Sequence, residues 1–135
     1  MKAVTMRRAY CREAAVMLAF ARLAVRWLPS AWLFGWAGRP MKRIRRFAID
    51  EADWIAWSVD HVGSRRRMTA LCLPRALAAH AMLRRRGIAS RLCLGVARNG
   101  GELAAHAWIE IGDKKIVGGD ESVAFTQLAA FGGAK

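Results

Sequence analysis

Apolar residues recur at steps of three and four in the first part of the chain, which is the pattern of an amphipathic helix. This run covers residues 10–28 and ends at Pro29, because proline lacks the N–H group that a helix interior needs. Tryptophans and other apolar residues then crowd residues 27–36, and a basic connector follows to Arg46. We expect residues 1–46 to form a helical segment that packs on the rest of one domain.

A second helix is predicted to begin at a group of acidic residues. Asp50, Glu51 and Asp53 fit its first turn, where carboxylates favour the positive end of the helix dipole. Apolar residues then recur at helical spacing until Gly63, which we expect to end the helix.

The third predicted helix lies in the middle of the chain, from Leu71 to Arg86. Pro74 fits only a first helical turn, so the helix begins at about Cys72 or Leu73. Gly87 marks its end, because glycine readily adopts the left-handed conformation that closes helices. Between these ends the sequence is almost entirely apolar, which indicates a central helix covered on several sides.

The period changes to two after this helix, as expected of strands whose side chains alternate between faces. Strands are predicted at Ser90–Val96 and Leu103–Ile111, and a third begins with Lys115–Val117. A tight hairpin at Gly112–Asp113 would join the second strand to the third. The tail at 122–131 shows no clear pattern. Helices followed by a small antiparallel sheet make this an α+β fold.

The composition is that of a globular domain of 135 residues with an unusual excess of positive charge. Basic residues number 23 against 10 acidic ones, a formal charge of +13. Such a surface is either simply solvated or suited to nucleic acid, an anionic membrane or an acidic peptide. A binder of single-stranded nucleic acid needs exposed aromatic rings among its basic groups. The tryptophans lie on apolar helical stretches, so we expect them to be core residues, and no nucleic-acid motif is evident.

The apolar part of the first helix is too short to span a membrane. Its uninterrupted stretch runs for eight residues, Ala14 to Ala21, whereas a membrane span needs about 20. No small-residue cleavage site of a signal peptide is evident. The sequence therefore predicts a soluble protein or a helix that lies on a membrane surface, and a membrane-surface adaptor is one alternative function.

The chain has three cysteines, Cys11, Cys72 and Cys93, and no CxxC pair. An odd number of cysteines in this arrangement argues against a disulfide framework or a zinc site and favours a reducing cytoplasm. Cys72 is the candidate nucleophile because it lies where the central helix begins. The unpaired N–H groups and positive dipole end of a helix can stabilise both a thiolate and an oxyanion. A buried, unreactive cysteine is the alternative interpretation.

His106 is the candidate general base. It lies in the predicted strand within AHAWIEI, although a lone histidine in such a setting is more often a core residue. His61 ends a helix and is a weaker candidate. His80 lies two turns along the central helix from Cys72, too far to take the proton of its thiol.

An acid should orient the imidazole and stabilise its cationic form. Asp113 lies in the hairpin turn, where turn formation explains it. A three-residue loop at 112–114 would pair His106 with Asp120 across the strands, within reach of a carboxylate. A two-residue loop would turn Asp120 to the other face, unless a bulge at Gly118–Gly119 restored the pairing.

Together these motifs resemble the transglutaminase-like leader peptidases of lasso-peptide biosynthesis. The resemblance rests on LCLPRALAAHAMLRRRGIASRLCLGVA followed by AHAWIEIGDKKIVGGD and covers residues 69–131. It implies a papain/transglutaminase-like core over residues 47–135 and a Cys–His–Asp peptidase that needs no cofactor or metal. In that family Cys72 would be the nucleophile, His106 the general base and, at a more variable spacing, Asp120 the orienting acid.

The resemblance also implies partners. Such a peptidase removes the leader from a ribosomally made precursor peptide, beside a cyclase that closes the lasso ring. Some members carry a leader-binding domain of winged-helix type ahead of the peptidase, but the residues before Cys72 lack its strand-rich pattern. A separate leader-binding protein is therefore expected. The same thiolate, imidazole and oxyanion hole also support acyl transfer to an amine, so an acyltransferase is a second alternative.

Overall fold

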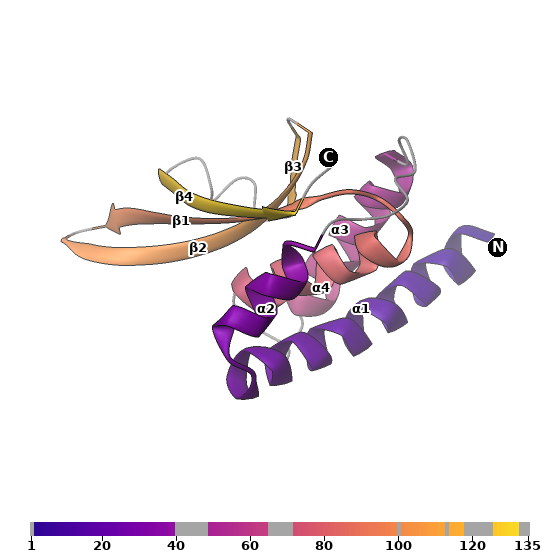
Figure 1. Cartoon of the computed structure of the whole chain (residues 1–135). Helices are drawn as coiled ribbons and strands as arrows, with labels where there is room; N and C mark the ends of the chain where they lie inside the picture. Colours follow the sequence, from indigo (N-terminus) through magenta and orange to yellow (C-terminus); the bar gives the residue numbers. More distant parts are fainter. Residues whose placement is uncertain are drawn as a thin grey trace.

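The computed structural model describes residues 2–39, 49–64, 72–99, 101–112, 114–117 and 126–132. In this part of the chain, helices precede strands, which confirms the α+β class. The order is α1 (Lys2–Trp27), α2 (Ser30–Ala37), α3 (Ile49–Gly63), α4 (Cys72–Arg85), β1 (Arg91–Asn99), β2 (Glu102–Ile111), β3 (Lys114–Val117) and β4 (Thr126–Gly132). Figure 1 shows the helices on one side of the sheet, with the hairpin of β1 and β2 extending beyond them.

The first helix begins earlier than its apolar pattern predicts. Residues 2–9 are rich in alanine, arginine and methionine, which are good helix formers, but Val4 and Met6 are exposed and give no buried stripe. The buried stripe starts only at Ala14 and continues through Leu18. Periodicity therefore indicated the part of α1 that contributes to the hydrophobic core and missed the part before it, where Arg7 lies over the rings of Trp54 and Trp57.

The tryptophan-rich segment forms a short helix that the pattern did not predict. In α2, Leu33 and Ala37 are buried, while Trp32 is 70% exposed. Trp27, the last residue of α1, is 74% exposed. The expectation that the tryptophans are core residues is therefore wrong for Trp27 and Trp32, and also for Trp57 on α3, which is 38% exposed. A segment with apolar residues on all sides of a helix cannot turn every one of them toward a single core.

The central helices lie where the sequence predicts them. α4 begins at Cys72 and carries Pro74 in its first turn. At its other end Gly87 has a φ of 73°, and the N–H of Ile88 donates to the carbonyl oxygen of Leu83 at 2.9 Å. This left-handed closure satisfies an otherwise unpaired carbonyl and leads the chain back into β1.

The strands form one antiparallel sheet in the order β3-β2-β1-β4. The tail without a clear pattern supplies β4, which pairs with β1. The loop between β2 and β3 has two residues, because Ile111 pairs with Lys114, so β3 begins one residue earlier than predicted. A register shift follows, and Ile109 pairs with Val117. That last pairing is the one that a three-residue loop would have given.

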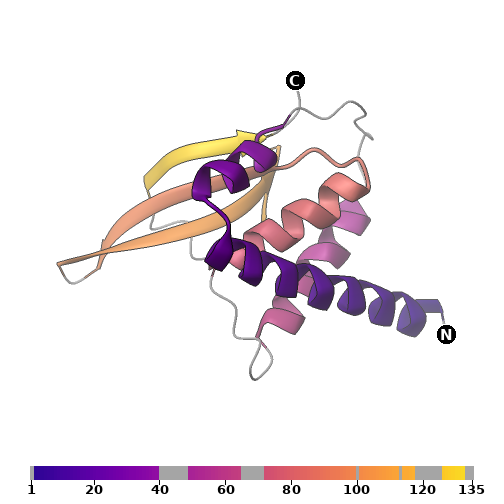
Figure 2. The same cartoon turned by 60° about the horizontal axis from the view of Figure 1, so that its bottom comes forward.

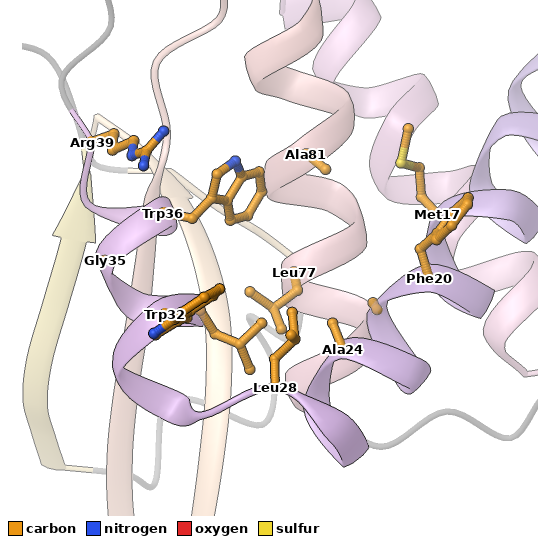
Figure 3. A pocket seen from close by; sticks show the side chains of 12 residues that line it. Met17, Phe20, Ala24, Leu28, Trp32, Gly35, Trp36, Arg39, Leu77 and Ala81 are labelled. Atoms are coloured by element: carbon orange, nitrogen blue, oxygen red, sulfur yellow. The ribbon is translucent and has the colours of Figure 1, made fainter.

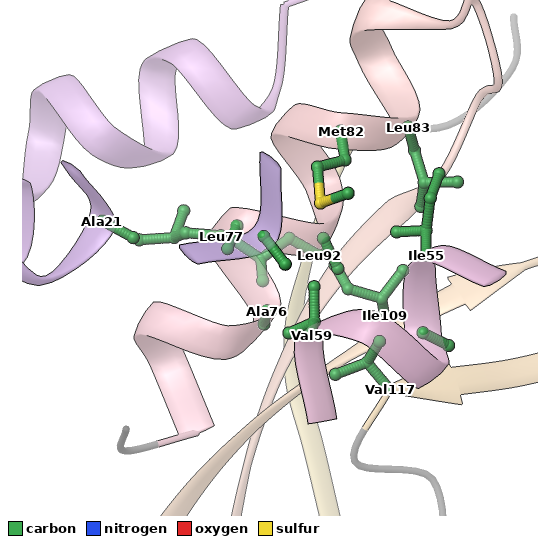
Figure 4. Packing of buried hydrophobic residues seen from close by; sticks show 14 of the residues in the cluster. Ala21, Ile55, Val59, Ala76, Leu77, Met82, Leu83, Leu92, Ile109 and Val117 are labelled. Carbon is green, nitrogen blue, oxygen red and sulfur yellow. The ribbon is translucent and has the colours of Figure 1, made fainter. Parts of the chain in front are cut away.

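A single hydrophobic core joins the helices to the sheet. Figure 4 shows side chains from different elements meeting there, among them Ala21, Ile55, Leu83 and Ile109. The predicted boundary at residue 46 lies outside the described residues, so the division into two segments stays a prediction, although both contribute to this core. None of the described helices is long and apolar enough to cross a membrane.

Candidate active site

Cys72 is the first residue of α4, as the sequence predicts. Its side chain is half-buried and packs against the hydrophobic core. The first N–H groups of a helix have no partner within that helix. This end of α4 can therefore stabilise negative charge, first on a thiolate and then on a carbonyl oxygen under attack.

The opposite directions of α4 and β1 place Cys72 toward the same end of the domain as His106. His80, in the middle of α4, is fixed beside Ser90 by a 2.7 Å hydrogen bond just ahead of β1. Cys72 lies about 12 Å from His80 along the helix, and Gly95 lies about 16 Å beyond Ser90 along the strand. Figures 1 and 2 show both segments leading the same way from this point, and Gly95 pairs with His106.

His106 belongs to a row of three alternate residues on β2, with Trp108 and Glu110. The rings of His106 and Trp108 stack with their centroids 6.0 Å apart. The Nε1–H of Trp108 donates to the carboxylate of Glu110 at 3.2 Å. The residues between them, Ala107 and Ile109, belong to the core. Because side chains alternate along a strand, the row of His106, Trp108 and Glu110 lies on the sheet face opposite the helices.

The structure thus brings the two predicted elements together but gives their side chains different surroundings. α4 packs against β2, yet Cys72 contacts the core whereas His106 lies against Trp108. The end of α4 that carries Cys72 and the row that carries His106 thus lie on different faces of the sheet, and the catalytic pairing of the two side chains stays a prediction.

Both candidate acids, Asp113 and Asp120, lie outside the described residues. The loop between β2 and β3 has two residues, the case in which the sequence predicts that Asp120 turns away from His106 unless a bulge at Gly118–Gly119 restores the pairing. The described strands show a register shift between Ile109 and Glu110, and the predicted bulge lies outside the described residues. The orienting role of Asp120 stays a prediction.

Gly95 is a residue of this region that the sequence analysis did not single out. A Cβ atom at this position would lie 2.8 Å from the Trp108 ring and 2.7 Å from the carbonyl oxygen of Thr126. Any side chain here would displace the indole or β4. Because Gly95 has no side chain, the indole of Trp108 can lie across β1, where the ring of His106 stacks on it. A pattern of H-x-W-x-E opposite a strand glycine was the available signal.

Glu110 holds a partly buried network that excludes Cys93 as a nucleophile. Arg91 donates to its carboxylate at 2.9 Å, and the thiol of Cys93 does so at 3.5 Å. Burial raises the pKa of the Cys93 thiol to about 12, and the negative charge of Glu110 adds to this effect. Cys93 therefore stays protonated. Within the described residues, no group of three His, Cys, Asp or Glu side chains is placed to hold a metal ion.

His80 is a structural residue. Its Nε2–H donates to the carbonyl oxygen of Ala37 at 2.9 Å, so its Nδ1 accepts the hydroxyl hydrogen of Ser90 at 2.7 Å. Burial lowers the pKa of His80 from 6.5 to about 4, and the nearby charge of Arg84 acts in the same direction. The ring is therefore neutral at physiological pH and joins α4 to α2 and to the start of β1.

Comparison with known protein families gives one match. Residues 14–130 match the transglutaminase-like superfamily, which is most of the chain and includes α4 and β2. No curated protein and no solved structure matches the chain significantly.

Proposed function

Because the chain belongs to the transglutaminase-like superfamily, whose members are Cys–His enzymes that hydrolyse or transfer acyl groups, we propose that it is a cysteine peptidase that removes the leader from a lasso-peptide precursor. Cys72 is the nucleophile, His106 the general base and Asp120 the orienting acid. The observation that carries the proposal is the position of Cys72 at the first residue of α4. The motifs around Cys72 and His106 supply the choice of substrate.

The proposed reaction begins at the N-terminal end of α4. The thiolate of Cys72 attacks the carbonyl carbon of the scissile peptide bond, and the N–H groups of the helix stabilise the resulting oxyanion. Protonated His106 then gives its proton to the leaving amine, and a thioester remains on Cys72. Water, deprotonated by His106, attacks the thioester and releases the acid and the thiol.

The row on β2 supports this role for His106 by restricting the imidazole. The ring stacks on the indole of Trp108. That indole donates a hydrogen bond to Glu110 and lies against the backbone of Gly95, where any side chain would displace it. The proposal requires the thiol of Cys72 and the ring of His106 to come within about 3 Å of each other. A structure with a covalently bound peptide aldehyde on Cys72 would measure that distance directly.

A separate leader-binding protein and a cyclase complete the proposal, with the reaction in the cytoplasm. A cleft that holds only the residues around the cut gains little from the rest of a long, flexible leader. A protein that binds both the leader and this enzyme would raise the local substrate concentration, to the order of millimolar for a short tether. We therefore expect slow cleavage by this protein alone.

The test is mass spectrometry of a candidate precursor incubated with this protein, with and without the leader-binding protein. We expect one cut between leader and core peptide, no cut with Cys72→Ala, and normal cutting with Cys11→Ala as the matched control. Equal rates with and without the leader-binding protein would remove the partner from the proposal. Addition of a primary amine distinguishes acyl transfer, because an amide product in place of the free acid would identify an acyltransferase.

A further inference from the structure

We propose that a groove between α1, α2 and α4 binds an acidic amphipathic helix of a partner protein. The groove lies on the helix layer, on the side of the sheet away from the His106 row. The inference goes beyond the proposed function, since binding at this surface requires no catalysis.

The groove is open and its floor is apolar. Its volume is about 740 Å³. Figure 3 shows side chains from three helices around it, with Arg39 at one end. The apolar lining includes Met17, Phe20, Leu28, Trp32, Trp36 and Leu77. A pocket of this size can accept several apolar side chains of one segment.

An exposed stripe on α1 continues this apolar surface. Val16, Phe20, Leu23 and Trp27 follow one another at steps of four, three and four residues, and each is at least 51% exposed. This spacing keeps them on one face of the helix and is the spacing of a helix–helix seam. The inward face of α1 is a different stripe, which begins with Ala14 and Leu18. α1 therefore has a second apolar face that the described elements leave exposed.

Large exposed apolar side chains in a continuous patch mark interaction surfaces in soluble proteins. The patch includes Trp27 and Trp32, which are 74% and 70% exposed. Tryptophan is enriched at the energetic centres of protein interfaces, where it buries a large area at small entropic cost. The stripe and the groove share Phe20, so one occupant can contact both.

The charges around the groove call for an acidic partner. Arg39 lines the groove, Arg84 lies over the ring of Trp36 in its lining, and Arg26 lies over the exposed ring of Trp27. Glu13, the single carboxylate of the three helices that form the groove, already pairs with Arg85 and Arg86. At the α2 end, Arg84 donates to the carbonyl oxygen of Arg39 at 2.9 Å. Burial and the charge of Arg39 lower the pKa of Arg84, which indicates that these two positive groups are not neutralised there.

The same charges and shapes disfavour other occupants. A second copy of this chain would set arginines against arginines, because the whole protein carries +13. A flat membrane surface would leave the concave floor unfilled. Single-stranded nucleic acid would stack on the exposed aromatic rings, but aliphatic side chains such as Leu77 and Met17 offer its bases no hydrogen bonds.

The test uses the full chain and a synthetic amphipathic helix with leucines at heptad spacing and glutamates on either side. Fluorescence anisotropy of the labelled peptide measures the dissociation constant. We expect the glutamate peptide to bind at least about tenfold more tightly than a matched peptide with lysines, and to weaken as salt screens the arginines. Absence of measurable binding by the glutamate peptide would overturn the proposal.

Variants locate the binding on the groove. Phe20→Glu and Leu23→Glu should each weaken peptide binding by about tenfold or more, because both side chains lie at the centre of the patch. Val4→Glu is the matched control, since Val4 is also exposed on α1 but lies outside the groove. Equal loss in all three variants would contradict the proposed location. Circular dichroism confirms that each variant keeps its helices.

Three competing occupants are tested with the same variants. Flotation with anionic phospholipid vesicles, binding of a labelled single-stranded oligonucleotide and sedimentation of the chain alone give the comparison. The groove would belong to one of these occupants if two results coincide. The acidic peptide must fail to bind, and Phe20→Glu must abolish binding of the vesicles, binding of the oligonucleotide or formation of a dimer. Cys72→Ala should bind the peptide normally, so failure of the peptidase proposal and failure of this one are distinguishable.

Discussion

The two buried histidines show that equal burial serves different ends in two regions of this molecule. His80 is fully buried and uses both ring nitrogens to hold three segments together, and its burial keeps the ring neutral by lowering its pKa. His106 is 5% exposed, and its ring stacks on the indole of Trp108. The hydrogen bonds of both ring nitrogens, and not burial alone, thus identify His80 as a structural residue.

The largest expected effect concerns the thiol at the start of the helix that also carries His80. Cys72→Ala should lower cleavage of the precursor by about 10⁴-fold or more, because the covalent step is lost while alanine preserves the helix. Product analysis by mass spectrometry gives the rate. Cys93→Ala should leave the chemical step unchanged, because the protonated thiol of Cys93 takes no part in it. Full activity in Cys72→Ala would show that the covalent step does not take place at the N-terminal end of α4.

Substitution of each histidine by alanine tests the difference between their roles most directly. His106→Ala should lower the rate by about 10²- to 10⁴-fold, since general acid–base catalysis is lost. His80→Ala should instead lower the free energy of unfolding by about 1–3 kcal/mol, because Ser90 and Ala37 lose their partner in a buried site. Cleavage rates per folded molecule and urea unfolding separate the two. The opposite ranking would mean that the structural and catalytic roles are exchanged.

The proposed orienting acid, Asp120, is a second feature that would distinguish His106 from His80. Asp120→Asn should lower the rate by about 10²-fold or more with little change in stability, because a carboxamide can hold the wrong tautomer of the imidazole. Asp113→Asn is the control in the same hairpin and should leave the rate nearly unchanged. If Asp113→Asn proves the more harmful substitution, the acid lies in the turn and not beyond it.

The support of the His106 ring can be disturbed without touching the histidine. Gly95→Ala places a methyl group against Trp108 and the backbone of β4. A displacement of the ring by about 1 Å can cost up to about 10²-fold in rate. We expect a loss of about tenfold or more, and fluorescence of Trp108 should change with it. Ala107→Gly, on the other face of β2, is the matched control. An unchanged rate in Gly95→Ala would show that the indole does not position His106.

The last expected effect is a dependence of stability on pH, which follows from the burial of His80. The pKa of His80 is about 4 in the folded protein and 6.5 in the unfolded chain, so the unfolded chain binds a proton first as the pH falls. The contribution of neutral His80 to the free energy of unfolding should therefore be fully present above about pH 6.5. It should be lost as the pH falls to about 4, which lowers the free energy of unfolding by at most roughly 3 kcal/mol. Urea unfolding at both pH values measures this. His80→Gln should reduce the decrease; an unchanged decrease would assign it to other groups.

Much of the fold and the first site residue follow from local chemistry. Pro74 and Gly87 bound the central helix on sequence grounds alone, and the structure places Cys72 at its first position. Trp27 and Trp32 were misplaced because an apolar pattern does not say which of two apolar faces is covered. β4 was missed for a related reason: the apolar residue Leu128 occupies an exposed position and so disrupts the alternation of apolar and polar residues.

The rest of the site depends on pairings between distant residues. The contact of Glu110 with Arg91 requires the register between β1 and β2, which no local pattern specifies. The register shift at Ile109 belongs to the same class, because the loop length at Gly112 alone would give a different pairing. Sequence patterns therefore predicted most of the elements and the position of Cys72 at the start of α4, while the surroundings of His106 emerged only from the assembled sheet.

The pairing of β4 with β1 has a consequence for the order of folding. β1 lies between β2 and β4, so one side of the strand next to His106 finds its neighbour only when residues 126–132 have been made. During synthesis all four helices have been made by residue 85, so they can assemble before the sheet is complete. Pairings between distant segments form slowly. We therefore expect the newly made chain to hold a formed α4 before the sheet that carries His106 is complete, and the proposed activity to appear only at the last stage of folding.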